Sequence, residues 1–187
     1  MLTGRQPGHG FGRAAVVGAG LMGRGIAGVL AAGGLDVVLC DIQPDVLAQA
    51  VSAAAALAAR AASTRPARAA EPGQVSASPD LSVAVRDADL VVEAVAESLA
   101  VKQEVFARLS VLAPSAVLAT NTSVLPVTAI AERAKDPGRV LGTHWWNPPD
   151  LIPVVEVVPG RLTAEDVTGR VMALLSANRP DTALESA

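Results

Sequence analysis

Two residues whose chemistry suits acid–base catalysis stand twelve positions apart, His144 and Glu156. His144 follows an apolar pair at 140–141 and should lie at the carboxyl end of a strand, shielded by the two tryptophans directly after it. Glu156 interrupts an apolar run at 154–158, where a buried carboxylate is costly unless another group pairs with it. If the two strands are neighbours, the carboxylate would fix the imidazole tautomer and raise the basicity of the other ring nitrogen. The pair predicts a general base; the alternative is a structural histidine at a turn and an edge glutamate facing water.

A glycine-rich turn with the pattern G-x-G-x-x-G joins an apolar strand to a helix, and it comprises Gly18, Ala19, Gly20, Leu21, Met22 and Gly23. The first glycine permits a tight turn, the second lets the backbone approach a pyrophosphate, and the third lets the helix pack closely on the strand. Asp41 follows the second strand, eighteen residues after Gly23, where a carboxylate can accept both hydrogen bonds of an adenosine ribose diol. Since a carboxylate repels a 2'-phosphate, the pattern predicts NAD rather than NADP as cofactor. The alternative is a tightly packed turn with a solvated acid.

Polar residues follow two further predicted strands. Thr120 is the last residue of the strand at 116–120, and Asn121, Thr122 and Ser123 follow it directly. These side chains should border the crevice at the carboxyl ends of a parallel sheet. Ordinary capping of the helix that follows is an equal alternative for Thr122. Glu97 and Lys102 follow the strand at 89–94 in the same way. By pattern alone, these two residues are only a surface pair.

Short apolar strands alternate with helices along most of the chain. The predicted strands are 14–17, 35–40, 89–94, 116–120, 140–143 and 154–158, and the main predicted helices are 26–32, 44–62, 80–86, 98–112, 126–133 and one that a capping box at Thr163 opens. This order predicts an α/β fold with a doubly wound, mostly parallel sheet, a Rossmann-type dinucleotide-binding domain. We expect residues 1–12 to form a flexible tail, residues 13–187 to form the NAD-binding domain, and residues 63–79 to be mobile.

The composition excludes several classes of protein. Fifteen basic and eighteen acidic residues give a formal charge of -3, without a basic cluster, so nucleic acid is not an expected partner. The uncharged stretch at 109–131 contains two prolines and several polar residues, so we expect no membrane span. The single cysteine, Cys40, excludes a disulfide framework and a cysteine-based zinc site. We therefore expect no metal, and we expect a cytoplasmic location.

Together these motifs resemble the NAD-binding domain of the 3-hydroxyacyl-CoA dehydrogenase family, from residue 13 to about 180. The resemblance is carried by VVGAGLMGRGIA, ADLVVEAVAE, ATNTSVLPVTAIA and GTHWWNPPDLIPVVEVV. It implies that His144 is the catalytic base, that Glu156 orients it, and that Ser123 hydrogen-bonds the substrate hydroxyl. It also implies that the cofactor and substrate pocket contains Asn147, Glu97 and Lys102, and that residues 18–23 with Asp41 hold NAD.

The resemblance implies oxidation of an L-3-hydroxyacyl-CoA by NAD, or the reverse reduction. The sequence departs from the family in having Trp145-Trp146 where a Phe pair is usual, in a shortened segment at 63–79, and in stopping where the family continues into a helical domain. Two alternatives follow: a dehydrogenase for a free 3-hydroxy acid or a carrier-protein thioester, and a non-catalytic NAD-binding subunit. The expected partners are a small-molecule acyl substrate and either further copies of this chain or a separate helical domain.

Overall fold

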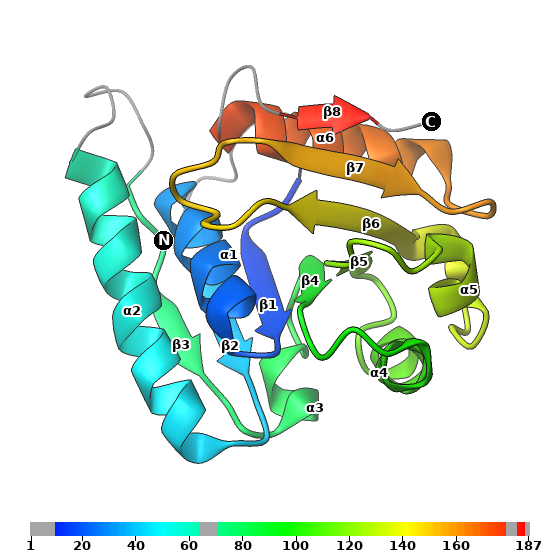
Figure 1. The fold of residues 1–187 in the computed structure, drawn as a ribbon, viewed down its shortest axis with the longest axis horizontal. Helices are drawn as coiled ribbons and strands as arrows, with labels where there is room; N and C mark the ends of the chain where they lie inside the picture. The colour runs from blue at the N-terminus through cyan, green and yellow to red at the C-terminus, as the bar shows by residue number, and fades with distance from the viewer. Residues whose placement is uncertain (1–9, 64–70, 179–182, 186–187) are drawn as a thin grey trace.

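The computed structural model describes residues 10–63, 71–178 and 183–185. Within these residues, an eight-stranded sheet has the strand order β3-β2-β1-β4-β5-β6-β7-β8 (Figure 1). The first six strands in this order are parallel, β7 is antiparallel to β6, and β8 is parallel to β7. The strands are β1 (Arg13–Val17), β2 (Asp36–Cys40), β3 (Val75–Ala77), β4 (Leu90–Glu93), β5 (Val117–Thr120), β6 (Val140–Trp145), β7 (Val155–Pro159) and β8 (Ala183–Glu185). The predicted doubly wound, mostly parallel α/β fold is confirmed.

Helices cover both faces of this sheet. Those described are α1 (Leu21–Ala32), α2 (Pro44–Ser63), α3 (Leu81–Ala84), α4 (Leu99–Leu112), α5 (Val127–Ala131) and α6 (Glu165–Asn178), with a 3-10 turn η1 at Pro137–Arg139. One buried cluster joins the sheet to α1, α2 and α6, and a second joins the other face to α3, α4 and α5. Because both faces are covered, polar chemistry is confined to the edges where the strands end.

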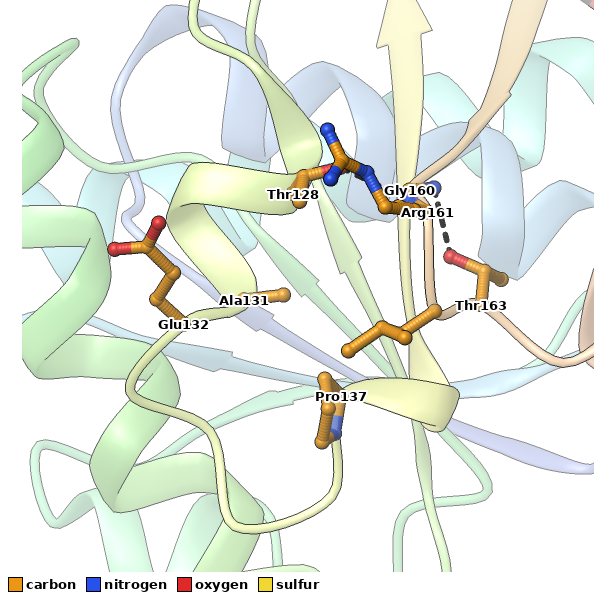
Figure 2. Close-up of a pocket in the computed structure, with 8 residues that line it drawn as sticks. Thr128, Ala131, Glu132, Pro137, Gly160, Arg161 and Thr163 are labelled. Atoms are coloured by element: carbon orange, nitrogen blue, oxygen red, sulfur yellow. Dashed lines mark hydrogen bonds between the residues drawn. The ribbon is translucent and has the colours of Figure 1, made fainter.

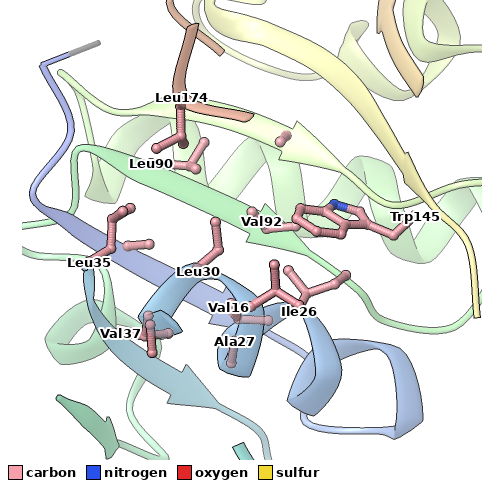
Figure 3. Close-up of a cluster of buried hydrophobic side chains, with 14 of the residues drawn as sticks. Val16, Ile26, Ala27, Leu30, Leu35, Val37, Leu90, Val92, Trp145 and Leu174 are labelled. Carbon is pink, nitrogen blue, oxygen red and sulfur yellow. The ribbon is translucent and has the colours of Figure 1, made fainter. Parts of the chain in front are cut away.

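The first cluster shows how the helices attach to the sheet. Ile26 and Leu30 of α1 are fully buried in one cluster with Val16 and Val92 of the central strands, and Leu174 of α6 joins the same cluster beside Leu90 (Figure 3). Each side chain of this size contributes about 1.5–3 kcal/mol when it leaves water. This burial holds α1, and with it the turn at its start, against β1.

Small residues let α1 and α2 approach closely. A Cβ atom added at Gly28 would come within 2.8 Å of Leu57 Cδ2 and 3.0 Å of the Ala54 carbonyl oxygen. Ala50, Ala54 and Ala58 form the buried side of α2. The alanine-rich sequence of α2 therefore serves close helix packing on this face.

The first helix begins earlier than the sequence predicted. We expected a turn over 18–25 and a helix from residue 26, but α1 begins at Leu21, directly after its N-cap Gly20. The prediction placed Gly23 and Gly25 before the start of the helix. Both lie inside the helix and pack closely there: a Cβ atom at Gly23 would lie 1.8 Å from the Gly18 carbonyl oxygen, which excludes a side chain, and one at Gly25 would lie 3.0 Å from the Pro149 ring.

Part of the segment predicted to be mobile, 63–79, is a strand. Residues 64–70 lie outside the described residues, but β3 pairs in parallel with β2, with Val75 opposite Val37. Local sequence could not predict this strand, because its three residues are held by hydrogen bonds to β2, and that pairing depends on the tertiary structure. The predicted tail, 1–12, lies mostly outside the described residues too, yet Phe11 is 2% exposed and the Gly12 N–H donates to Asp89 Oδ2 at 2.8 Å.

The predicted capping box at Thr163 is wrong. The Thr163 hydroxyl donates to the Val140 carbonyl at 2.5 Å and accepts from the Gly160 N–H at 2.7 Å, so it ties the end of β7 to the start of β6. Helix α6 begins two residues later, at Glu165. In the part of the chain that the structure describes, no helix is long and apolar enough to cross a bilayer.

Cys40 ends β2 in the second buried cluster and is 4% exposed. Burial and the nearby carboxylates of Asp41 and Asp80 raise the pKa of this thiol from its usual 9.0 to about 11. The thiolate is the nucleophile, so at pH 8 the reactive fraction is on the order of a hundredfold smaller than for an ordinary cysteine.

We therefore expect iodoacetamide at pH 8 to modify the native protein at least about a hundredfold more slowly than the same protein in guanidinium chloride. Mass spectrometry of timed samples measures both rates, and the ratio should shrink as the pH rises towards 11 because the native thiol then ionises. Equal rates in the native and unfolded protein would contradict the burial of Cys40.

Candidate active site

The register of three strands brings the predicted acid–base residues together at the carboxyl edge of the sheet. Thr120, the last residue of β5, is opposite Gly142 of β6, so His144 extends two residues past the level where β5 ends. The antiparallel pairing of β6 with β7 sets His144 directly opposite Glu156. The loop after β5 reaches back over this extension and brings Ser123 to the ring.

The three side chains form a continuous hydrogen-bonded chain. His144 Nδ1 lies 2.5 Å from Glu156 Oε2, and His144 Nε2 lies 3.2 Å from Ser123 Oγ. The His144 side chain is 23% exposed and that of Glu156 is 34% exposed, so the pair is partly desolvated but open to a ligand. The predicted pairing of His144 with Glu156 is present, and a carboxylate at Nδ1 leaves Nε2 free to accept a proton.

The residues after His144 take different positions. Trp146 is 46% exposed, and its ring centroid lies 5.5 Å from that of His144 at a tilt of 44°. Trp145 points to the opposite face, where it is 3% exposed beside α1 (Figure 3). The expectation that both tryptophans shield His144 is therefore half wrong, because successive strand residues alternate between faces. Asn147 is exposed in the next loop and has no hydrogen bond to another described residue.

The glycine turn lies at the same edge, at the end of β1. Gly18 has φ +99°, and a Cβ atom there would lie 2.5 Å from the Ala94 carbonyl oxygen, so only glycine fits. Its N–H donates to the Cys40 carbonyl at 2.8 Å. By contrast, a Cβ atom at Gly20 would meet no atom within 4 Å, and no side chain caps the start of α1. An open, uncapped helix start of this kind fits the phosphates of a dinucleotide.

Asp41 is joined to the glycine turn by hydrogen bonds. Its Oδ2 accepts from the Ala19 N–H at 2.8 Å and its Oδ1 accepts from the Gln43 N–H at 3.0 Å. The carboxylate is half-buried rather than freely solvated. Asp41 therefore links the glycine turn to the end of β2.

The interpretation of Glu97 and Lys102 as a surface pair is wrong. The Lys102 side chain is 0% exposed, and its Nζ lies 2.8 Å from Glu93 Oε1, 3.0 Å from Glu93 Oε2 and 3.2 Å from Glu97 Oε2. Glu97 is 38% exposed and also accepts hydrogen bonds from the Thr122 hydroxyl and, at 3.0 Å, from the Ser123 N–H. The sequence placed Lys102 at the surface because local sequence does not show which face of α4 packs against the sheet.

Burial and hydrogen bonding move the two carboxyl pKa values in opposite directions. Burial raises the pKa of Glu93, and the charge and hydrogen bonds of Lys102 only partly oppose it. Burial also raises the pKa of Glu97, but the hydrogen bond from Thr122, the Lys102 charge and the Ser123 N–H outweigh it, and the net pKa is lowered. Glu97 is thus a carboxylate with a lowered pKa beside the loop that carries Ser123.

Sequence reasoning missed Glu93 at this edge, and it placed Asn121 here without giving it a specific partner. Asn121 Oδ1 accepts from the Trp145 N–H at 3.1 Å, which links the loop after β5 to β6. Glu93 ends an otherwise apolar strand, and this is the same signal that singled out Glu156. The same pattern could have predicted that Glu93 is a buried carboxylate with a hydrogen-bonding partner.

A pocket of about 230 Å³ lies elsewhere, beside the start of β6 and the end of β7 (Figure 2). It is lined by Thr128, Ala131 and Glu132, by Pro137, and by residues 160–163. None of the predicted site residues contacts it, so it is separate from the edge that carries His144. Among the described residues, no three His, Cys, Asp or Glu side chains converge as a metal site would require.

The geometry agrees with what comparison with known proteins finds. A family model described as "3-hydroxyacyl-CoA dehydrogenase, NAD binding domain" matches residues 13–179. A 5-formyl-3-hydroxy-2-methylpyridine 4-carboxylate 5-dehydrogenase of Mesorhizobium japonicum is 34% identical over 165 residues, covering 86% of this chain and 53% of that protein. A 3-hydroxyadipyl-CoA dehydrogenase of Escherichia coli is 41% identical, covering 86% of this chain and 34% of that protein.

The crystal structure of a 3-hydroxybutyryl-CoA dehydrogenase from Escherichia coli superposes with a TM-score of 0.80 at 32% identity, over 94% of this chain and 38% of that one. The chain therefore spans about half or less of these relatives. The matched model, the shared fold and the open glycine turn agree: the chain belongs to the 3-hydroxyacyl-CoA dehydrogenase family, NAD-dependent dehydrogenases whose NAD-binding domain it comprises.

Proposed function

We propose that this chain carries the acid–base and cofactor half of a dehydrogenase that interconverts an L-3-hydroxyacyl-CoA and its 3-oxo form with NAD. The observation that supports this best is the hydrogen-bonded chain from Ser123 through His144 to Glu156. It lies at the same edge as the glycine turn, where a bound dinucleotide and a substrate would meet.

In the proposed oxidation, Glu156 accepts a hydrogen bond from the Nδ1–H group of His144, so that the unprotonated Nε2 is the base. Ser123 Oγ, 3.2 Å from Nε2, marks where a hydroxyl can hydrogen-bond to the ring. The substrate hydroxyl proton passes to Nε2, and Ser123 orients the oxygen that becomes the carbonyl. NAD, when bound, supplies the acceptor for the hydride that leaves C3. In the reverse direction, the imidazolium returns the proton to the 3-oxo oxygen.

The proposed cofactor contacts follow the open helix start. The backbone of Gly20, Leu21 and Met22 would hold the pyrophosphate, and Asp41 would accept from the adenosine ribose. Glu97 and Asn147 are proposed to border the nicotinamide end, since Glu97 already accepts from the Ser123 N–H and Asn147 is exposed in the loop directly after β6.

The candidate substrates differ in the group to which the 3-hydroxyacyl chain is attached. The Escherichia coli relative is named for an acyl-CoA, whereas the Mesorhizobium japonicum relative is named for a free pyridine carboxylate. A free 3-hydroxy acid therefore stays a second candidate beside the CoA thioester, and a carrier-protein thioester a third. Turnover assays with all three forms of one acyl group distinguish them, and NAD binding without any turnover would favour a non-catalytic subunit.

Cofactor preference tests the role of Asp41. We expect the unmodified chain to bind NAD more tightly than NADP, and Asp41→Ala to weaken NAD binding by about tenfold, since a hydrogen bond to a charged group is lost. The preference over NADP should narrow because the repulsion of the 2'-phosphate disappears. Calorimetric titration measures both affinities, and Asp45→Ala at the exposed start of α2 is the matched control. Equal affinity of the unmodified chain for both cofactors would refute the assignment.

Turnover tests the acid–base pair. His144→Ala should lower kcat by a hundredfold or more and leave NAD affinity within about twofold, because the base acts on the substrate proton. Glu156→Gln should lower kcat less and shift its pH profile, because the neutral amide no longer supports a protonated ring. Steady-state rates between pH 5 and 10 measure both effects. A pH profile identical to that of the unmodified chain would show that Glu156 does not act through His144.

Apolar side chains around the site support association with further copies of the chain or with a separate helical domain. Val124 is 79% exposed, Leu151 72% and Leu21 58%, all beside the carboxyl edge. We expect the isolated chain to self-associate, and Val124→Ser with Leu151→Ser to reduce this. Light scattering over a range of concentrations measures it, with Val111→Ser, exposed at 63% on α4, as the control. A monomer at every concentration would exclude self-association.

A further inference from the structure

Two opposite charges are fully buried beneath the loop that carries Ser123. Glu93 ends β4 and Lys102 lies on α4, and both side chains are 0% exposed. Such a pair is weak evidence for stability, because desolvation of the two ions offsets much of their attraction, and apolar replacements are often neutral. A buried pair of this kind therefore calls for a role in geometry rather than in net stability.

All the polar groups of the pair are used. Glu93 accepts from Lys102 Nζ through both oxygens, from the Val95 N–H at 2.7 Å and from the Thr120 hydroxyl at 2.6 Å. Lys102 Nζ also donates to the Asn121 carbonyl at 3.1 Å. The network thus joins the ends of β4 and β5 to α4 through directional, charge-assisted bonds.

Two branches lead from this network to the acid–base residues. In the first, Lys102 holds Glu97, which accepts from the Ser123 N–H at 3.0 Å, and Ser123 Oγ contacts His144. In the second, Lys102 holds the Asn121 carbonyl while Asn121 Oδ1 accepts from the Trp145 N–H, directly after His144.

We propose that Glu93 and Lys102 are positioning residues: by holding Glu97 and the Asn121 carbonyl, they fix the loop at 121–124 so that Ser123 and His144 keep one separation. The relevance of this separation to catalysis rests on the proposed function; the positioning of the loop does not. Lys102 acts through these neighbours rather than on a ligand, because it has no exposed surface and its three N–H groups already face four oxygens.

Glu93→Gln tests the proposal, because it keeps the shape of the side chain and removes its charge. Lys102 then has only Glu97 as a counter-charge, so Glu97 is drawn towards it and its bonds to the loop weaken. Amide hydrogen exchange of the full chain without cofactor, followed by NMR, is the direct readout. We expect exchange of the Ser123 and Trp145 amides to rise by about ten- to a hundredfold, with α1 and β2 amides unchanged.

Glu104→Gln is the matched control, since Glu104 is on the same helix but its ion pair with Arg133 is exposed. A uniform rise in exchange across the sheet, or no change at Ser123 and Trp145, would overturn the proposal. If Glu93→Gln does not fold, Thr120→Val removes one hydrogen bond to Glu93 without changing charge. It should affect the same two amides, by a smaller factor, and failure to do so would also overturn the proposal.

Kinetics separates this proposal from the proposed function. In an active chain, Glu93→Gln should lower kcat about tenfold or more and change the NAD dissociation constant by less than about threefold, because misplacement affects the reacting geometry. Glu104→Gln should change neither. If the unmodified chain never turns over, the proposed function fails, while the exchange measurement still decides whether Glu93 and Lys102 position the loop.

Discussion

Coverage of both faces of the sheet by helices is the constraint on which the rest of this structure depends. Once α1, α2 and α6 pack on one face and α3, α4 and α5 on the other, polar side chains within the strands are few. They gather where the strands end, and parallel strands end at one edge. The glycine turn, Asp41, the Glu93 cluster and His144 share that edge because β1, β2, β4, β5 and β6 run in the same direction.

Two carboxylates that interrupt apolar strands illustrate two solutions to the cost of burying charge. Glu156 stays 34% exposed and has a histidine as its partner, so its interaction changes with protonation of the ring. Glu93 is fully buried with a lysine, a hydroxyl and a backbone N–H as partners, which makes a rigid network. The first arrangement suits proton transfer and the second suits the positioning of a loop.

The glycine turn depends on close backbone contacts as much as on the phosphates it is suited to hold. Gly18 and Gly23 have no space for a side chain because the chain folds against itself, whereas Gly20 faces open space. Asp41 joins the turn through the Ala19 N–H, so the acid that would recognise the ribose also supports the helix start. The same few residues therefore shape the turn and carry the proposed recognition of NAD.

Local patterns determined a large part of this protein: the alternating strands and helices, the glycine turn with Asp41, and the choice of His144 and Glu156 as candidate acid–base residues. These are short-range features, since strand burial, helix periodicity and turn chemistry are properties of neighbouring residues. Tertiary structure alone decided that β3 pairs with β2, that Trp145 turns to the α1 face, and that Lys102 is buried against Glu93. The physical reason is that each of these depends on the register of a strand or the rotation of a helix against a distant element, which local sequence does not encode.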